Sequence, residues 1–98
     1  MKQTKVNICG IPHTIRKCKD EFTACDQHFG EVDYKTCEIL LADDLTEAIE
    51  TETLIHEILH SIFFHIGRND ISQDENFIDV LSNAMIHSFS VKTYEEGK

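Results

Sequence analysis

Three histidines and a glutamate fall within the stretch Thr53–His65, "TLIHEILHSIFFH". His56 and His60 are four residues apart, so on a helix both imidazoles project from one face and can bind one metal ion. Glu57 lies about 100 degrees further round such a helix, beside the ion, where a carboxylate can take a proton from metal-bound water. This H-E-x-x-H pattern predicts a hydrolytic zinc centre with Glu57 as the general base.

The same stretch also has the features of a core helix whose histidines bind no metal. Apolar residues flank the pair at Ile55, Ile58 and Leu59, as expected for a half-buried helix. A metal-free pair would place two polar rings in the core with no evident partner, however, and burial without a partner is costly. The pattern therefore favours zinc.

A third zinc ligand must come from elsewhere, because a catalytic zinc ion usually takes three protein ligands and keeps one position open. His65 follows His60 by five residues, and the helical period turns it away, so we expect a surface or helix-end role. Glu75 and Asp79 share a face of the next predicted helix, which a turn can bring back over the first. We predict Glu75 as the ligand and Asp79 as the acceptor of a ligating histidine's N–H.

Alternatives remain open for these acidic residues. Asp79 could be the ligand in place of Glu75. Glu75 could instead complete a capping box that begins at Ser72, which would serve the helix N-terminus. Asp74 is expected to be a solvated charge at the helix start. For the group that stabilises an oxyanion, the candidates are His28, Tyr34 and His87.

The elements that position these residues follow from hydrophobic periodicity. Residues 1–43 alternate in "KVNIC", "HTIRKC" and "KTCEILLA", which predicts a hairpin and a third strand. Residues 44–67 form the active-site helix, with Asp43 or Asp44 as N-cap, Gly67 as terminator, and Ile55, Leu59, Ile62 and Ile66 as core stripe. Residues 72–91 form the ligand helix, and 92–98 a frayed tail. We expect a single α+β domain (1–98) in which two antiparallel helices cover a small three-stranded sheet, antiparallel or mixed.

Composition excludes several classes of function. The net charge of −9 over 98 residues opposes direct contact with nucleic acid. Neither a signal peptide nor an apolar run of about 18 residues is present, so we expect a cytoplasmic protein without a membrane partner. The four cysteines should then remain thiols. They include no C-x-x-C pair, although a zinc site built from all four is an alternative.

With these residues, the chain resembles a minimal gluzincin-type zinc metallopeptidase, closest to small phage and mobile-element proteins related to the ImmA/IrrE group. The likeness covers "TLIHEILHSIF" and "DENFIDVLSNAM", and more loosely "CEILLADDL". It implies zinc ligation by His56, His60 and Glu75, with Glu57 as the base. It also implies that the strand "CEILLA" pairs with the substrate backbone. The gap from His60 to Glu75 is shorter than in large gluzincins, whose spacing Asp79 fits better by count.

The expected function is hydrolysis of peptide bonds in an intracellular protein or peptide, with a regulatory protein as one candidate substrate. The location would be the host cytoplasm if a phage encodes the chain. The main alternative is a non-catalytic phage binding module, in which zinc clamps two helices of a small domain. Glu57 favours the enzyme, because a structural site gains nothing from a carboxylate beside the metal. An acidic inhibitor or nucleic-acid mimic is a third interpretation.

Overall fold

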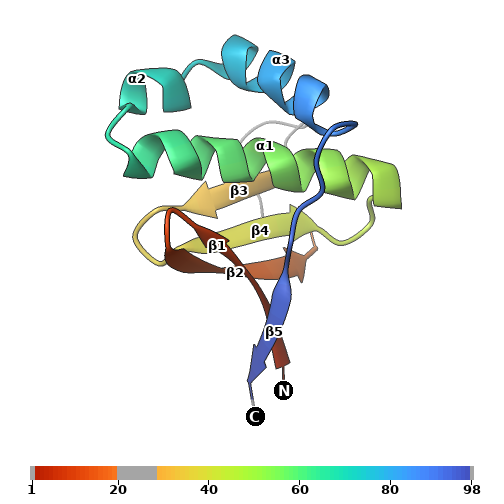
Figure 1. Cartoon of the computed structure of the whole chain (residues 1–98). Coiled ribbons are helices and arrows are strands. Elements are labelled where there is room, and N and C mark those ends of the chain that lie inside the picture. The colour runs from red at the N-terminus through yellow and green to blue at the C-terminus, as the bar shows by residue number, and fades with distance from the viewer. Residues whose placement is uncertain (1, 20–28, 98) are drawn as a thin grey trace.

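The computed structural model describes residues 2–19 and 29–97. These residues form an α+β fold, as predicted, in which a five-stranded mixed sheet packs with three helices (Figure 1). The strands are β1 (Lys2–Ile8), β2 (Ile11–Cys18), β3 (Gly30–Asp33), β4 (Glu38–Ala42) and β5 (Tyr94–Gly97). The helices are α1 (Glu47–His65), α2 (Asn69–Ser72) and α3 (Glu75–Met85).

The sheet has the strand order β3-β4-β2-β1-β5. The predicted hairpin is present as β1 and β2, with Ile8 opposite Ile11. Cys9 and Gly10 form its two-residue turn, and both have positive φ (54° and 79°), as a type I′ turn requires. β4 runs parallel to β2 and antiparallel to β3. Because β3 comes first in the strand order, it lies at one edge of the sheet.

Two strands were not expected from the sequence. β3 lies in a segment that reads as a polar loop, and it pairs with β4. The tail was predicted to fray, but Tyr94–Gly97 pairs antiparallel with β1 instead. Contacts outside the backbone support this pairing, since Lys5 lies 3.1 Å from Glu96 and the Tyr94 hydroxyl donates to Asn7. The prediction of three strands was therefore wrong by two.

The active-site helix is shorter than the predicted range of 44–67. Thr46, rather than Asp43 or Asp44, is the N-cap, and its hydroxyl accepts the N–H of Ile49 at 3.3 Å. At the other end Gly67 has a φ of 86°, as its predicted terminator role requires. Its N–H bonds to the carbonyl of Phe64, and that of Arg68 bonds to Phe63, which together make a Schellman motif. Ile66 falls in this turn and is 55% exposed, so its placement in the core stripe was wrong.

The predicted second helix, 72–91, is helical only over α3, and a separate short helix, α2, precedes it. Ser72 ends α2, and α3 starts at Glu75 with Asp74 as its N-cap. The Asp74 carboxylate accepts the N–H of Phe77 at 3.1 Å, so Asp74 is a cap rather than only a solvated charge, and the capping box from Ser72 is absent. α3 ends at Met85, six residues short of the predicted limit.

The layers are the sheet, then α1, then α3, which runs back over α1 in the opposite direction (Figure 1). Within the described residues α3 packs on α1 and α2 and not on the strands, so only α1 covers the sheet, which corrects the expected arrangement. One side of α1 packs through Leu54 and Ile58 on the sheet core of Val6, Ile8, Ile39 and Leu41. Its other side packs through Ile55 and Leu59 on Ile78 of α3. Among the described helices, none is both long and apolar enough to cross a membrane.

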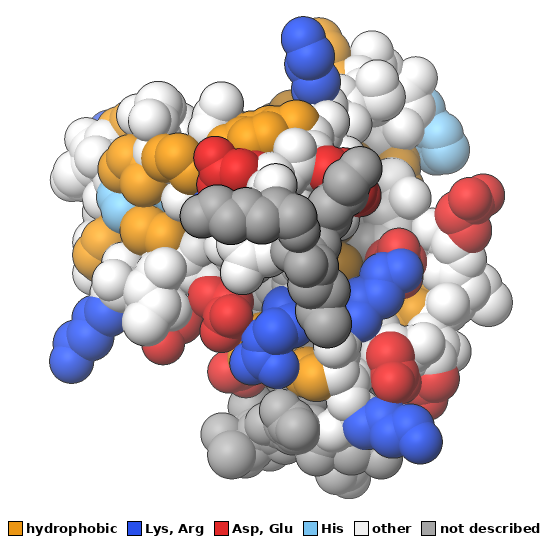
Figure 2. Space-filling model, turned by 90° about the horizontal axis from the view of Figure 1, so that it is seen from below, with side chains coloured by type: hydrophobic (Ala, Val, Ile, Leu, Met, Phe, Trp, Pro, Cys, Tyr) orange, Lys and Arg blue, Asp and Glu red, His pale blue; other side chains and the backbone are white. Residues whose placement is uncertain are grey.

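Charged side chains of both signs mix on the face seen from below the molecule (Figure 2). Ion pairs of the described residues also join the two signs: Arg16 lies 3.1 Å from Glu38, and Lys17 lies 3.0 Å from Glu50. On the described part of this face, basic groups are interspersed among the acidic ones. A nucleic-acid mimic needs a continuous acidic surface, whereas the described part of this face carries both signs.

Candidate metal centre

A cleft of about 1040 Å³ lies between the edge strand β3, one face of α1 and one side of α3. Gly30, Glu31 and Val32 line it on the strand side. On the helix side its lining includes His56, Glu57, His60, Glu75 and Asp79. The fold therefore brings every residue of the predicted site to one cavity.

His56, His60 and Glu75 converge on one point within this cleft. Their ligand atoms all lie within 4.8 Å of one another. The Nε2 atoms of the two histidines are 3.1 Å apart, and each is also 3.1 Å from an oxygen of Glu75. Glu75 is the first residue of α3, and each of its two carboxylate oxygens faces one of the histidine nitrogens.

The other ring nitrogen of each histidine already has an acceptor. The Nδ1–H of His60 donates to the carbonyl of Ser72, and the Nδ1–H of His56 donates to the Asp79 carboxylate at 3.0 Å. These bonds fix the tautomers, so in each neutral ring the lone pair is on Nε2. Asp79 thus occupies the position that the sequence analysis assigns to it, beside a histidine predicted as a ligand.

Lone pairs of three groups therefore face one another: the Nε2 atoms of His56 and His60 and the carboxylate of Glu75. A divalent metal ion can bridge such a set of lone pairs. A tetrahedral zinc ion with bonds of about 2.0–2.1 Å keeps neighbouring ligand atoms roughly 3.3 Å apart. The observed spacing of 3.1 Å fits that geometry, and the ligand set of two imidazoles and one carboxylate suits zinc.

Glu57 lines the cleft next to these ligands and is only 7% exposed. Burial raises the pKa of Glu57 to about 8, and the negative charges of Glu75 and Glu31 add to the effect. A nearby divalent cation acts in the opposite direction and favours the carboxylate. Glu57 is therefore a proton-accepting group whose charge depends on what the cleft contains.

A hydrogen-bond chain connects Tyr34, Ser72 and His60 at the site. Ser72 donates its hydroxyl proton to the carbonyl of His60 at 2.8 Å, which leaves the Tyr34 hydroxyl as donor to Ser72 at 3.3 Å. Burial raises the pKa of Tyr34, so its phenol keeps its proton. Of the three oxyanion candidates, Tyr34 lines the cleft, His87 does not, and His28 lies outside the described residues.

The strand expected to pair with substrate is not the one at the cleft. β4, which contains "EILLA", lies between β3 and β2 and is paired on both sides, so that expectation was wrong. The edge strand β3 borders the cleft instead. A Cβ at Gly30 would lie 2.7 Å from Thr53 of α1 and 3.0 Å from the carbonyl of Leu40, so this strand can approach the helix only with glycine at that position. Four mostly polar residues gave no strand pattern that could have revealed it.

The remaining candidates from the sequence are placed elsewhere. His65 lies with His13 and Cys37, away from the ligands of the cleft. Cys25 lies outside the described residues, and Cys9, Cys18 and Cys37 do not gather into one cysteine ligand set within the described residues. The four-cysteine alternative gains no support from the three that are described.

Comparison of the chain with models of protein families, with curated proteins and with solved structures gives no match. The family resemblance therefore depends on the residues of the site and on their geometry alone.

Proposed function

We propose that this chain is a zinc-dependent peptidase of the gluzincin type, with His56, His60 and Glu75 as metal ligands. The observation that carries the proposal is the convergence of three lone-pair donors at 3.1 Å separations, with both imidazole Nδ1–H groups already donating elsewhere. A bound zinc ion supplies Lewis acidity, which lowers the pKa of a water ligand towards about 7 and polarises a carbonyl.

The chain's own residues supply the rest of the chemistry. Glu57, held beside the ligands, accepts a proton from the attacking water and delivers it to the leaving amine. The edge strand β3 borders the cleft, where an extended peptide can add to the sheet through backbone hydrogen bonds. Tyr34 lines the cleft and is our candidate for stabilising the oxyanion, for which its hydroxyl proton has to turn from Ser72 to the substrate oxygen. Asp79 holds the His56 ring in orientation.

The position of Glu57 favours an enzyme over a non-catalytic zinc module. A metal that only clamps α1 to α3 needs the three ligands and no further carboxylate, yet Glu57 is buried against the same cleft. Burying a carboxyl group without a partner costs stability, and a catalytic role would account for keeping Glu57 there. We place the enzyme in the cytoplasm, with an intracellular protein or peptide as substrate, where the described thiols would stay reduced.

Cleavage of a peptide library by the zinc-loaded protein, read by mass spectrometry, tests this function. The Glu57→Gln variant should bind zinc as the wild type does and lose at least a hundredfold in cleavage rate. The matched control is Glu52→Gln, which changes another cleft-lining carboxylate of α1. It should keep zinc and retain most of the activity. Zinc-loaded wild type that cleaves no peptide would favour the binding-module function.

A further inference from the structure

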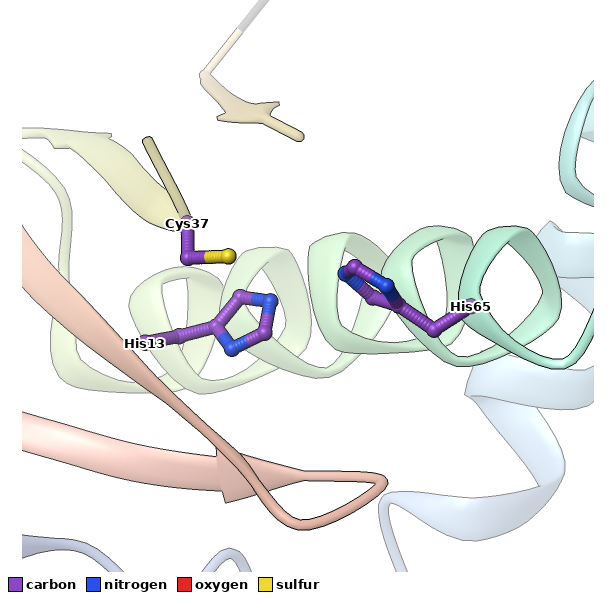
Figure 3. A group of neighbouring side chains, drawn as sticks. All are labelled: His13, Cys37 and His65. Atoms are coloured by element: carbon purple, nitrogen blue, oxygen red, sulfur yellow. The ribbon is translucent and has the colours of Figure 1, made fainter. Parts of the chain in front are cut away.

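A second group of metal-ligating side chains lies on the other side of α1 from the cleft histidines. His13 comes from β2, Cys37 from the turn before β4, and His65 from the last residue of α1. Figure 3 shows the three side chains converging, with the Cys37 sulfur directed towards the two rings. Their ligand atoms all lie within 4.8 Å of one another. Three elements far apart in the sequence thus meet at one point.

His13 is fully buried and has a fixed tautomer. Its Nδ1 lies 2.8 Å from the carbonyl of Ile11, which can only accept, so Nδ1 carries the proton. The lone pair is therefore on Nε2, where the Ser61 hydroxyl now donates at 2.8 Å. A ring held by a backbone carbonyl through one nitrogen, with a lone pair on the other, has the arrangement found in metal-binding histidines.

His65 supplies an observation that points independently to a ligand. Its Nε2 atom is buried and has no hydrogen-bond partner among the described residues. Buried ring nitrogens almost always have a partner, because leaving one without is costly. The His65 ring meets that of His13 edge-on, with centroids 5.4 Å apart. An ion between the two rings would satisfy this nitrogen.

Cys37 is held in place by its backbone. Its φ of 55° is in the left-handed region, which side-chain-bearing residues rarely adopt. Its carbonyl accepts the N–H of Thr14, the residue after His13, at 3.0 Å. This backbone bond holds Cys37 next to His13, the histidine with which its thiol would bind the metal.

We propose that His13, Cys37 and His65 form a second metal site, which binds a zinc-like divalent transition metal and stabilises the fold. One thiolate and two imidazoles make a ligand set of intermediate softness that suits zinc and cobalt. Tetrahedral ligand atoms lie roughly 3.3–3.6 Å apart, so the side chains need to close by no more than about 1.5 Å. On binding, the Cys37 thiol releases its proton to solvent. The Ser61 hydroxyl rotates away from Nε2, and water completes the coordination.

This site would tie the C-terminal end of α1 to the β1–β2 hairpin and to the β3–β4 turn. Tyr34 of that turn already stacks on Phe64, with ring centroids 4.1 Å apart. Ser61 follows the cleft ligand His60, so the metal would steady the helix that carries the cleft ligands without touching substrate. Its role does not depend on the proposed peptidase activity.

Cobalt titration followed by absorption spectroscopy tests the second site separately from the first. Only a thiolate ligand gives a sulfur-to-cobalt charge-transfer band, and the cleft ligands contain no sulfur. The wild type should bind two equivalents of Co²⁺ and show this band. His56→Ala should lose one equivalent and keep the band, whereas Cys37→Ser should lose the band and one equivalent. Cys9→Ser, which changes an exposed thiol, is the matched control and should behave as the wild type.

Thermal unfolding distinguishes a variant that has lost the metal site from a variant that fails to fold. In chelator, Cys37→Ser should melt at the wild-type temperature, and zinc should then raise the Tm of the wild type more than that of the variant. His65→Gln gives a second test that leaves the thiol in place, and it should weaken cobalt binding at the band-forming site at least tenfold. A wild type without the charge-transfer band would overturn the proposal. So would a band of equal intensity in Cys37→Ser.

Discussion

Replacement of the ionisable carboxyl of Glu57 by an amide should stabilise the metal-free protein, and the gain should grow as the pH rises. The buried carboxyl has a pKa of about 8 in the folded protein, against an ordinary value of 4.5 in the unfolded chain. Below pH 4.5 both states are protonated at this group, so it makes no difference to stability. Between pH 4.5 and about 8 the unfolded chain ionises while the folded protein keeps its proton. The free energy of unfolding therefore falls as the pH rises through this window.

The magnitude follows from the same pKa values. The window spans about 3.5 pH units, and each unit corresponds to about 1.4 kcal/mol, so the loss reaches about 5 kcal/mol by pH 8. Because Glu57 is only 7% exposed, solvent does little to reduce it. A domain of this size is stable by about 5–15 kcal/mol in total, so the effect should dominate its pH dependence.

Urea unfolding in chelator at pH 5, 6.5 and 8, monitored by circular dichroism, measures this effect. Glu57→Gln and wild type should differ little at pH 5, and the variant should be the more stable by several kcal/mol at pH 8. Zinc should shrink that difference, because a cation in the cleft favours the charged wild-type carboxylate. If the difference in unfolding free energy between Glu57→Gln and wild type stayed constant from pH 5 to pH 8, the raised pKa of Glu57 would be refuted.

Three further perturbations test how the structure supports the site. Asp79→Ala removes the acceptor 3.0 Å from His56 Nδ1 and should weaken zinc binding about 10–100-fold in a chelator competition; unchanged affinity would contradict this role. Gly30→Ala places a Cβ 2.7 Å from Thr53 and should lower stability by about 1–3 kcal/mol in urea unfolding; a wild-type midpoint would show that β3 can move away freely. Asp74→Ala removes the cap of α3 and should cost about 1 kcal/mol, with Asp70→Ala, an exposed and non-capping change, as the control that should cost less.

The helical period was enough to predict that His56 and His60 lie together on one face of α1. His56 and His60 share a face in any α-helix, and an antiparallel partner has to pass over that face within a short connection. The sequence favoured Glu75 without excluding Asp79, because the choice depends on where α3 starts. In the structure Ser72 contacts His60 through both its hydroxyl and its carbonyl, so the chain turns there and Asp74 becomes the cap.

Other features depended on contacts that a local pattern does not contain. β3 and β5 are four residues each and mostly polar, and they become strands through pairing with β4 and β1. The group of His13, Cys37 and His65 joins positions 24 and 28 residues apart on three elements, a spacing that no motif encodes. The α+β class was predictable from periodicity, whereas the edges of the sheet and this group required the tertiary structure.

The central claim is that His56, His60 and Glu75 bind zinc, and a chelator-competition titration of zinc tests it most directly. The titration is performed in the Cys37→Ser background, so that only the cleft ligands contribute. One zinc ion should bind per chain, and Glu75→Ala should weaken it by more than the roughly 100-fold expected from loss of an orienting partner. No zinc bound at neutral pH, or an affinity that is unchanged in Glu75→Ala, would contradict the claim.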